Sequence, residues 1–418
     1  MARIRSHGRS FVLGALFTAL PVMAQDTTSW NSRLKDGIAA INSGHYEQAV
    51  QILTAVAEES KSFPAGDVRR ADVALSLASA YQYQGRLAAA EPLYLEAKTT
   101  LEAAGPAARH TLGITLHGLA QLRIGESKWN DAEELLRSAI QICGETGGEK
   151  DPCSLASRTH LGELYLLQYR SSEAESMLTS AVTVLRQSSL VKNDLLADAL
   201  RLLADVYRLQ GRYALAEPLL KESLNLSSQL GECHPLVADR MVNLAGLYRL
   251  ERDAARAEPL LRKAVRIYEM SSDPHLADAI NELGLIAIED GKYAIAKEDF
   301  ERSLVLYEKT YGPDHILVAN AEAGLAQAYI GERNYKKAES IIRRAIAIGR
   351  ASLGDAHFAV AKLFMVAARV EEREHNRPEA DQLYRQALTI YRRSLPNDSP
   401  DRAEAEKQYA QFSKSFQK

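Results

Sequence analysis

The sequence predicts an all-α fold, a right-handed superhelical α-solenoid of about nine helix-turn-helix repeats with a C-terminal capping helix. Three observations predict it. Nine alanines recur at intervals of 39 to 42 residues, a small residue precedes each by twelve positions, and a large apolar residue follows each by four. A period of this regularity is typical of stacked repeats. These alanines, called the anchors below, are Ala49, Ala90, Ala132, Ala174, Ala216, Ala257, Ala296, Ala338 and Ala380.

The small residues explain how two helices could pack in each repeat. Every residue twelve positions before an anchor is glycine or alanine, for example Gly37, Ala78 and Gly162. Residues three, four and seven positions after an anchor share one face of a helix with it. Because helices approach closely only where neither carries a bulky side chain, each repeat is predicted to be a helical hairpin. The large residues at the fourth position are Leu53, Tyr94, Leu136, Leu178, Leu220, Leu261, Phe300, Ile342 and Tyr384.

The first helix of each hairpin has start and stop signals. Glycine five positions before the anchor fits a left-handed helix stop. Asp or Asn 23 positions before the anchor is a good N-cap, and proline often follows it, where its missing N–H has no cost. The stops are Gly44, Gly85, Gly211 and Gly291, and the starts are Asp67, Asp151, Asn193 and Asp273. The position after the start holds proline in three repeats, as Pro152, Pro235 and Pro274.

This arrangement resembles the tetratricopeptide repeat family. The match runs from a small residue and tyrosine, as in residues 244–248, to Ala257, Leu261 and Ala264. The usual unit has 34 residues. The longer unit here, with Glu-Pro segments such as Glu217-Pro218, looks like the kinesin-light-chain-type subfamily. The resemblance covers about residues 29 to 395.

The two ends of the array depart from this pattern. Asp36 stands where other repeats have leucine, and Glu371 stands where tyrosine is expected. Atypical terminal repeats suit capping units, and residues 401–416 are predicted to form one more helix over the last repeat. The expected organisation is a signal peptide at 1–24, the repeat array at 25–398 and the capping helix at 399–418.

The first 24 residues have the pattern of a secretory signal peptide. Three arginines precede an apolar run from Phe11 to Leu20, and cleavage is expected after Ala24. The run is too short to span a bilayer. We therefore expect a periplasmic or secreted protein. A mitochondrial presequence and a chance apolar start in a cytoplasmic protein are the alternatives.

Charge and motifs exclude several function classes. Without the three leader arginines the chain has 48 basic and 54 acidic residues, so nucleic acid is not an expected partner, nor is membrane insertion after cleavage. The chain lacks the phosphate-loop, H-E-x-x-H, C-x-x-C and G-x-S-x-G motifs. His234, His315 and His357 share the helix-start position with Asp and Asn, so we interpret them as structural. We expect no enzyme, metal or cofactor.

The three cysteines leave two alternatives open. Cys143 and Cys153 lie across a short link and could form a disulfide in an oxidising compartment, whereas Cys233 is two repeats further along. The other possibility is three unpaired thiols.

Ligand contacts are expected on the first helices, which should line the inner surface of the array. Arg208 and Arg249 share one phase and could bind a carboxylate. In tetratricopeptide proteins an asparagine at the phase of Asn243 commonly holds a peptide backbone, because an amide both donates and accepts. The alternative is a solvated face of mixed charge. The candidates are Arg201, Asp205, Arg208, Asn243, Arg249, Asn281 and Glu282.

The tyrosines nine positions before an anchor could instead form a stacking platform, but their helical spacing favours the core. The sequence thus predicts an exported, non-catalytic scaffold that binds a peptide or protein segment on its concave face. An adaptor subunit of an exported enzyme complex and a self-assembling structural array are the alternatives.

Overall fold

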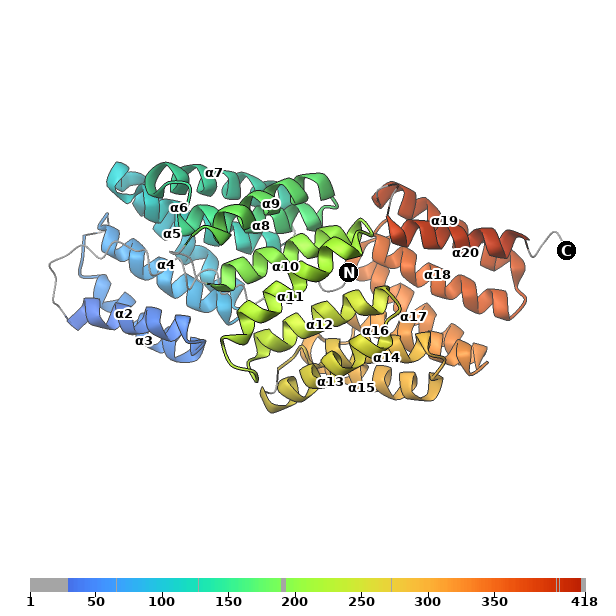
Figure 1. Ribbon diagram of the computed structural model, residues 1–418. Helices are drawn as coiled ribbons and strands as arrows, with labels where there is room; N and C mark the ends of the chain where they lie inside the picture. The colour runs from blue at the N-terminus through green and yellow to red at the C-terminus, as the bar shows by residue number, and fades with distance from the viewer. Residues whose placement is uncertain are drawn as a thin grey trace. The chain divides into compact units, whose positions relative to one another are not determined.

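The computed structural model describes residues 29–64, 66–126, 128–188, 193–271, 273–395, 397 and 399–414. Within these ranges the chain is helical, with one short 3₁₀ helix at Pro106–Ala108 and no strand, so the predicted all-α repeat fold is confirmed (Figure 1). The predicted signal peptide lies outside the described residues. None of the described helices combines the length and the apolar character that crossing a membrane requires.

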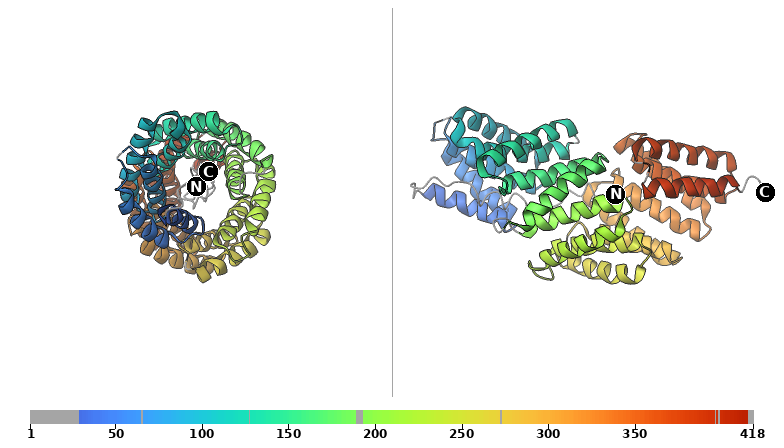
Figure 2. Two further views of the ribbon diagram at one scale, coloured as in Figure 1. Left: turned by 90° about the vertical axis from the view of Figure 1, so that its left-hand side faces the viewer. Right: turned by 45° about the horizontal axis from the view of Figure 1, so that its top comes forward.

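The described helices form nine hairpins and one final helix, α20 (Pro400–Lys414) (Figures 1 and 2). The hairpins are α2–α3 (Ser29–Asn42, Tyr46–Ser60), α4–α5 (Val68–Tyr83, Leu87–Ala104), α6–α7 (Arg109–Gly125, Trp129–Gly147), α8–α9 (Pro152–Leu167, Ser171–Arg186), α10–α11 (Asn193–Leu209, Tyr213–Ser228), α12–α13 (Pro235–Leu250, Ala254–Ser271), α14–α15 (Leu276–Glu289, Tyr293–Tyr311), α16–α17 (Ile316–Gly331, Tyr335–Leu353) and α18–α19 (Phe358–Arg373, Arg377–Ser394).

The chain divides into two compact units, and the division falls within α10, between Leu203 and Ala204. The described residues of the first unit are called the N-unit below, and those from Ala204 onward are called the C-unit. Each unit is described by itself.

The anchors lie where the sequence predicts, at the contact between the two helices of each hairpin. All nine have an exposed fraction of 0%. A Cβ at Gly162 would lie 2.5 Å from Leu178, and one at Gly37 would lie 2.6 Å from Leu53. In both hairpins the large residue four positions after the anchor fills the space that glycine leaves. The small residues therefore set the distance between the helices, because a close-packed interior has no room for another methyl group.

The left-handed helix stop also occurs in hairpins that have no glycine at the stop position. The predicted stop glycines have φ between +72° and +77°. Four other hairpins place a non-glycine residue with φ of 59° to 62° at the same position, and these residues are Tyr169, Arg252, Arg333 and His375. The bond that closes the helix is the same in both groups, since Arg212 N–H donates to Tyr207 O and Arg170 N–H donates to Tyr165 O, at 2.8 and 2.9 Å. The stop thus persists where the backbone conformation is unfavourable for an L side chain.

The helix starts are confirmed in most repeats. Asp67 and Asp151 accept hydrogen bonds from backbone N–H groups of α4 and α8. The Nδ1 atoms of His234, His315 and His357 accept equivalent bonds from the second residue after each, at 3.2 to 3.3 Å. These histidines are N-caps, as the sequence predicts. The expected N-cap at Asp273 is wrong by two residues, because a turn intervenes and α14 begins at Leu276 with His275 as its N-cap.

The end of the chain covers the last hairpin. Phe412 of α20 is buried and its ring lies 5.0 Å from that of Tyr384 on α19. The Tyr409 hydroxyl donates to Asp381 at 2.9 Å. Apolar surface that α19 would otherwise expose is therefore in contact with α20.

Candidate functional site

The first helices of successive hairpins contact one another within each unit. In the N-unit these contacts link α2, α4, α6 and α8, and in the C-unit they link α12, α14, α16 and α18. One side of these helices is formed by the residues that stand eight, eleven and fourteen or fifteen positions before each anchor. These residues share a side because they are spaced three or four positions apart, which is about one helical turn. We call this surface the first-helix face. It contains all seven predicted binding residues, and each of them is half-buried.

In the N-unit the first-helix face carries a chain of neutral hydrogen bonds. Gln82 of α4 donates to Gln121 of α6 at 3.0 Å, and the Gln121 amide lies 2.9 Å from His160 Nε2 on α8. The buried Tyr94 hydroxyl donates to Gln82 at 2.6 Å. This amide ladder crosses three successive first helices and contains both donors and acceptors, which is the combination that binds a peptide main chain.

His117 lies beneath the amide ladder and is fully buried. Its Nδ1 is hydrogen-bonded with Ser157 at 2.9 Å, and its ring packs edge-on against His160 with centroids 4.8 Å apart. Burial, reinforced by His160, holds the pKa of His117 well below its usual value. Both histidines are therefore part of the packing between α6 and α8.

In the C-unit the first-helix face is charged. The Arg249 guanidinium lies 3.0 Å from Glu282 and 2.8 Å from Glu289. Burial lowers the pKa of Arg249, but the two carboxylates outweigh burial and raise it overall, so the side chain stays charged. Arg208 pairs with Asp205 at 2.9 Å on its own helix. The predicted guanidinium row is thus already neutralised by neighbouring acids, and a ligand carboxylate would have to displace them.

The remaining candidates are distributed over three helices. Asn243 lies on α12, Asn281 lies on α14 beside Glu282, and Arg201 belongs to the part of α10 in the N-unit. The Asn281 Oδ1 atom is buried and has no hydrogen-bond partner. The structure therefore brings Arg249 and Glu282 together, and it places Asp205 beside Arg208.

Two of the tyrosines nine positions before an anchor, Tyr165 and Tyr248, connect successive hairpins. The Tyr165 hydroxyl donates to Glu133, and the Tyr248 hydroxyl donates to Glu217, in each case at 3.0 Å and to the residue directly after the preceding anchor. A guanidinium covers each ring at 4.1 Å, from Arg170 and Arg256 respectively. These rings are occupied by cation–π contacts, which supports the core interpretation over a stacking platform.

The cysteines form a separate feature of the N-unit. Cys143 and Cys153 are joined by a disulfide with a Cα–Cα distance of 5.8 Å, and Cys233 is free and exposed.

Sequence reasoning missed Gln82 and Gln121. These residues stand eight and eleven positions before their anchors, and His160 stands fourteen before its own. The ladder crosses the helices obliquely, by about one turn for each hairpin. A comparison of equal positions in successive repeats cannot find it, whereas a search for polar residues that shift by three positions per repeat would.

Comparisons with known proteins agree with this architecture. The model of the MalT-like tetratricopeptide repeat region matches residues 46–277, and that of the tetratricopeptide repeat matches residues 275–351 and 324–393. No curated protein matches the sequence significantly.

Solved structures show the same fold. A Rap protein complexed with competence and sporulation factor has a TM-score of 0.67 and 13% identity, over 87% of this chain and 98% of the other. The apo form of the quorum sensor NprR from B. thuringiensis has a TM-score of 0.66 and 15% identity, over 86% and 98%. These similarities concern the fold alone.

Proposed function

Because the chain belongs to the tetratricopeptide repeat family, we propose that it is a non-catalytic scaffold that binds an extended peptide or protein segment on its first-helix face. The observation that carries the proposal is the series of half-buried polar side chains along successive first helices in both units. Such side chains are partly desolvated and held in place, so hydrogen bonds to a ligand cost little further ordering. A Rap protein of the same fold is complexed with competence and sporulation factor.

The chemistry of the face favours main-chain recognition over recognition of an acidic terminus. The amide ladder of the N-unit is neutral, and the Arg249 group of the C-unit contains more acid than base. Amide donors and acceptors match the alternating N–H and C=O groups of an extended chain. The expected ligand is therefore a neutral or weakly basic extended segment.

Export is part of the proposal. It is supported by the basic, apolar and small-residue order of residues 1–24 and by the Cys143–Cys153 disulfide, since such bonds persist in oxidising compartments. Mass spectrometry of the protein from its native host tests this. A mature chain that begins at Gln25 supports export, and an intact leader in a cytoplasmic fraction contradicts it.

The binding surface can be tested with short unstructured peptides displayed on phage. Two variants alter the face without a change in net charge, Asn243→Ala and the paired Arg249→Gln/Glu282→Gln. We expect each to reduce capture of selected peptides at least about tenfold, the scale of a contact residue in a small interface.

The matched control is Lys263→Gln/Glu232→Gln, which removes an exposed ion pair of 3.1 Å away from the first-helix face. Urea unfolding of every variant checks the fold. If the control reduces capture as much as the face variants do, or if the face variants capture peptides normally, the proposed surface is wrong.

A further inference from the structure

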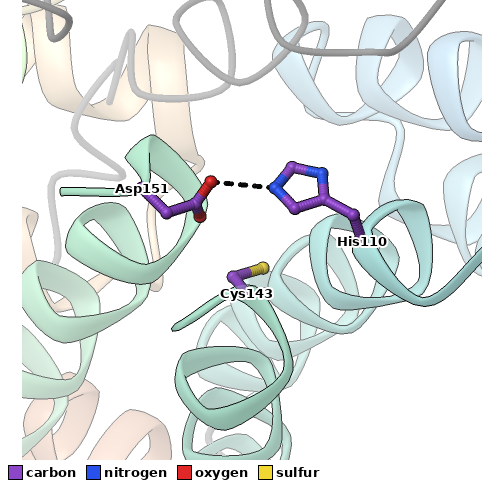
Figure 3. A group of neighbouring side chains, drawn as sticks. All are labelled: His110, Cys143 and Asp151. Carbon is purple, nitrogen blue, oxygen red and sulfur yellow. Dashed lines mark hydrogen bonds and ion pairs between the residues drawn. The ribbon is translucent and has the colours of Figure 1, made fainter. Parts of the chain in front are cut away.

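Three helices of the N-unit bring together side chains that ligate metals. His110 lies in the first turn of α6, Cys143 near the end of α7, and Asp151 caps the start of α8. One ligand atom of each lies within 4.8 Å of the others, and His110 Nε2 is 2.9 Å from Asp151 Oδ2 (Figure 3). Cys153 adds a fourth candidate, because its sulfur is bonded to that of Cys143.

The backbone holds this cluster in place. Asp151 uses Oδ1 to accept from Ser154 N–H at 2.9 Å, which leaves Oδ2 directed at His110. A Cβ at Gly147 would lie 2.2 Å from Asp151 Oδ2, and a Cβ at Gly113 would lie 2.4 Å from Cys143 Sγ. Two glycines thus leave the space that the carboxylate and the sulfur occupy. Both cysteines have an exposed fraction of 0%, whereas His110 remains partly exposed.

Two cysteines, a histidine and an aspartate form a donor set suited to zinc. Zn²⁺ prefers four ligands in a tetrahedron, with bonds of about 2.0 Å to nitrogen and oxygen and about 2.3 Å to thiolate sulfur. Ligand atoms then lie about 3.5 Å apart. The widest separation in the cluster, up to 4.8 Å, must therefore shorten by about 1 Å, whereas His110 Nε2 and Asp151 Oδ2, now 2.9 Å apart, and the two bonded sulfurs must move apart. Breaking the sulfur–sulfur bond frees both cysteine side chains to make that movement.

We propose that the reduced chain binds one Zn²⁺ through Cys143, Cys153, His110 and Asp151, and that the disulfide and the zinc site exclude each other. The disulfide accepts two electrons and two protons from a thiol reductant, which becomes oxidised to its own disulfide. Binding of Zn²⁺ by the two resulting thiols releases two protons. In either state α7 is tied to α8, by a covalent bond or through the metal. This proposal does not depend on the proposed function.

The test uses the full mature chain with Cys233→Ser, which removes the exposed thiol as a competing ligand. One sample is oxidised and the other is reduced with a phosphine. Both are equilibrated with zinc sulfate, freed of excess metal and measured by elemental mass spectrometry. We expect about one zinc ion per reduced chain and almost none per oxidised chain. Zinc should also raise the Tm of the reduced sample alone.

Variants identify the ligands. His110→Ala and Asp151→Asn should each weaken zinc affinity of the reduced chain at least about tenfold, as measured by competition with a chromophoric chelator. The control is His275→Ala, because His275 Nδ1 also lies beside a buried carboxylate, Asp273 Oδ1 at 2.7 Å, in the turn before α14. Equal zinc content in the oxidised and reduced chains overturns the proposal. This comparison uses the chain with all four ligands intact, so it holds even if a ligand variant fails to fold. Unchanged affinity in both folded ligand variants also overturns it.

Discussion

The N-unit and the C-unit are built from the same hairpin but fill their first-helix faces with different chemistry. The N-unit has an amide ladder above the buried neutral His117, whereas the C-unit has ion pairs around Arg249 on this face and, next to the face on α16, a buried carboxyl group at Glu322. Burial raises the pKa of Glu322 to about 7, although Arg344 lies 2.8 Å from it. One repeat frame therefore tolerates both neutral and charged polar groups, because the anchors and small residues that set the packing of each hairpin are the same in both units.

The two buried groups, His117 in the N-unit and Glu322 in the C-unit, should contribute to stability with opposite pH dependence. The folded pKa of His117 lies below its unfolded value of about 6.5, so its contribution is complete above that pH and is lost on acidification. The folded pKa of Glu322, about 7, lies above its unfolded value of about 4.5. Its contribution is complete below pH 4.5 and is lost as the pH rises to 7.

The largest expected effect tests whether both units depend on the same packing. Gly162→Ile in the N-unit and Gly284→Ile in the C-unit should each lower the free energy of unfolding by about 3 kcal/mol, because the new side chain overlaps Leu178 or Phe300. Urea denaturation followed by circular dichroism measures this. Gly66→Ala is the control, since no atom lies within 4 Å of a Cβ there. If either isoleucine variant lowers the free energy of unfolding as little as the control does, the two units do not depend on the same packing.

Glu322→Gln sharpens the contrast on the charged side. At pH 8 the variant should be more stable than the wild type by up to about 3 kcal/mol, since an ionised buried carboxyl group costs about 1.36 kcal/mol per pKa unit and the pKa of about 7 already includes the attraction of Arg344. The difference should disappear below about pH 4.5. Hydrogen exchange of α16 and α17 peptides at both pH values measures it. A gain that is independent of pH would contradict the assigned titration.

His117→Asn tests the neutral side. Asparagine can keep the bond to Ser157 but cannot titrate, so the loss of N-unit stability between pH 7 and pH 5 should shrink. At pH 7.5 the smaller side chain should cost about 1 to 2 kcal/mol. Hydrogen exchange of α6 and α8 is the measurement. If acid destabilises the variant as much as the wild type, His117 is not the acid-sensitive group.

The smallest effect concerns the helix stops. Arg252→Gly and Arg333→Gly should each stabilise the C-unit by about 1 kcal/mol, because glycine relieves the left-handed conformation at φ of 60° and 59°. Gly291→Ala is the converse change and should destabilise by a similar amount, because Gly291 has a φ of 72° and no atom lies within 4 Å of a Cβ there. Thermal unfolding measures all three. If the arginine variants are less stable than the wild type, contacts of those side chains outweigh backbone strain.

Local pattern was enough to predict the hairpins. The anchors, the small residues before them and the N-caps act within about 25 positions of one another, so their spacing specifies each helix pair directly. For the predicted binding residues, the sequence indicated the helix face but not the neighbouring side chains. Sequence placed Arg249 on the correct helix face but could not show that Glu282 and Glu289, 33 and 40 residues away, neutralise it.

The sequence by itself determined the helix pairs, their number and the side of each that packs, because these depend on periodicity within one repeat. Tertiary structure decided the rest: that four non-glycine residues adopt the left-handed stop, that Gln82, Gln121 and His160 join across three helices, and that Arg249 faces two acids. Such features depend on which side chains of the adjoining repeat occupy the same space, and no spacing within a single repeat carries that information.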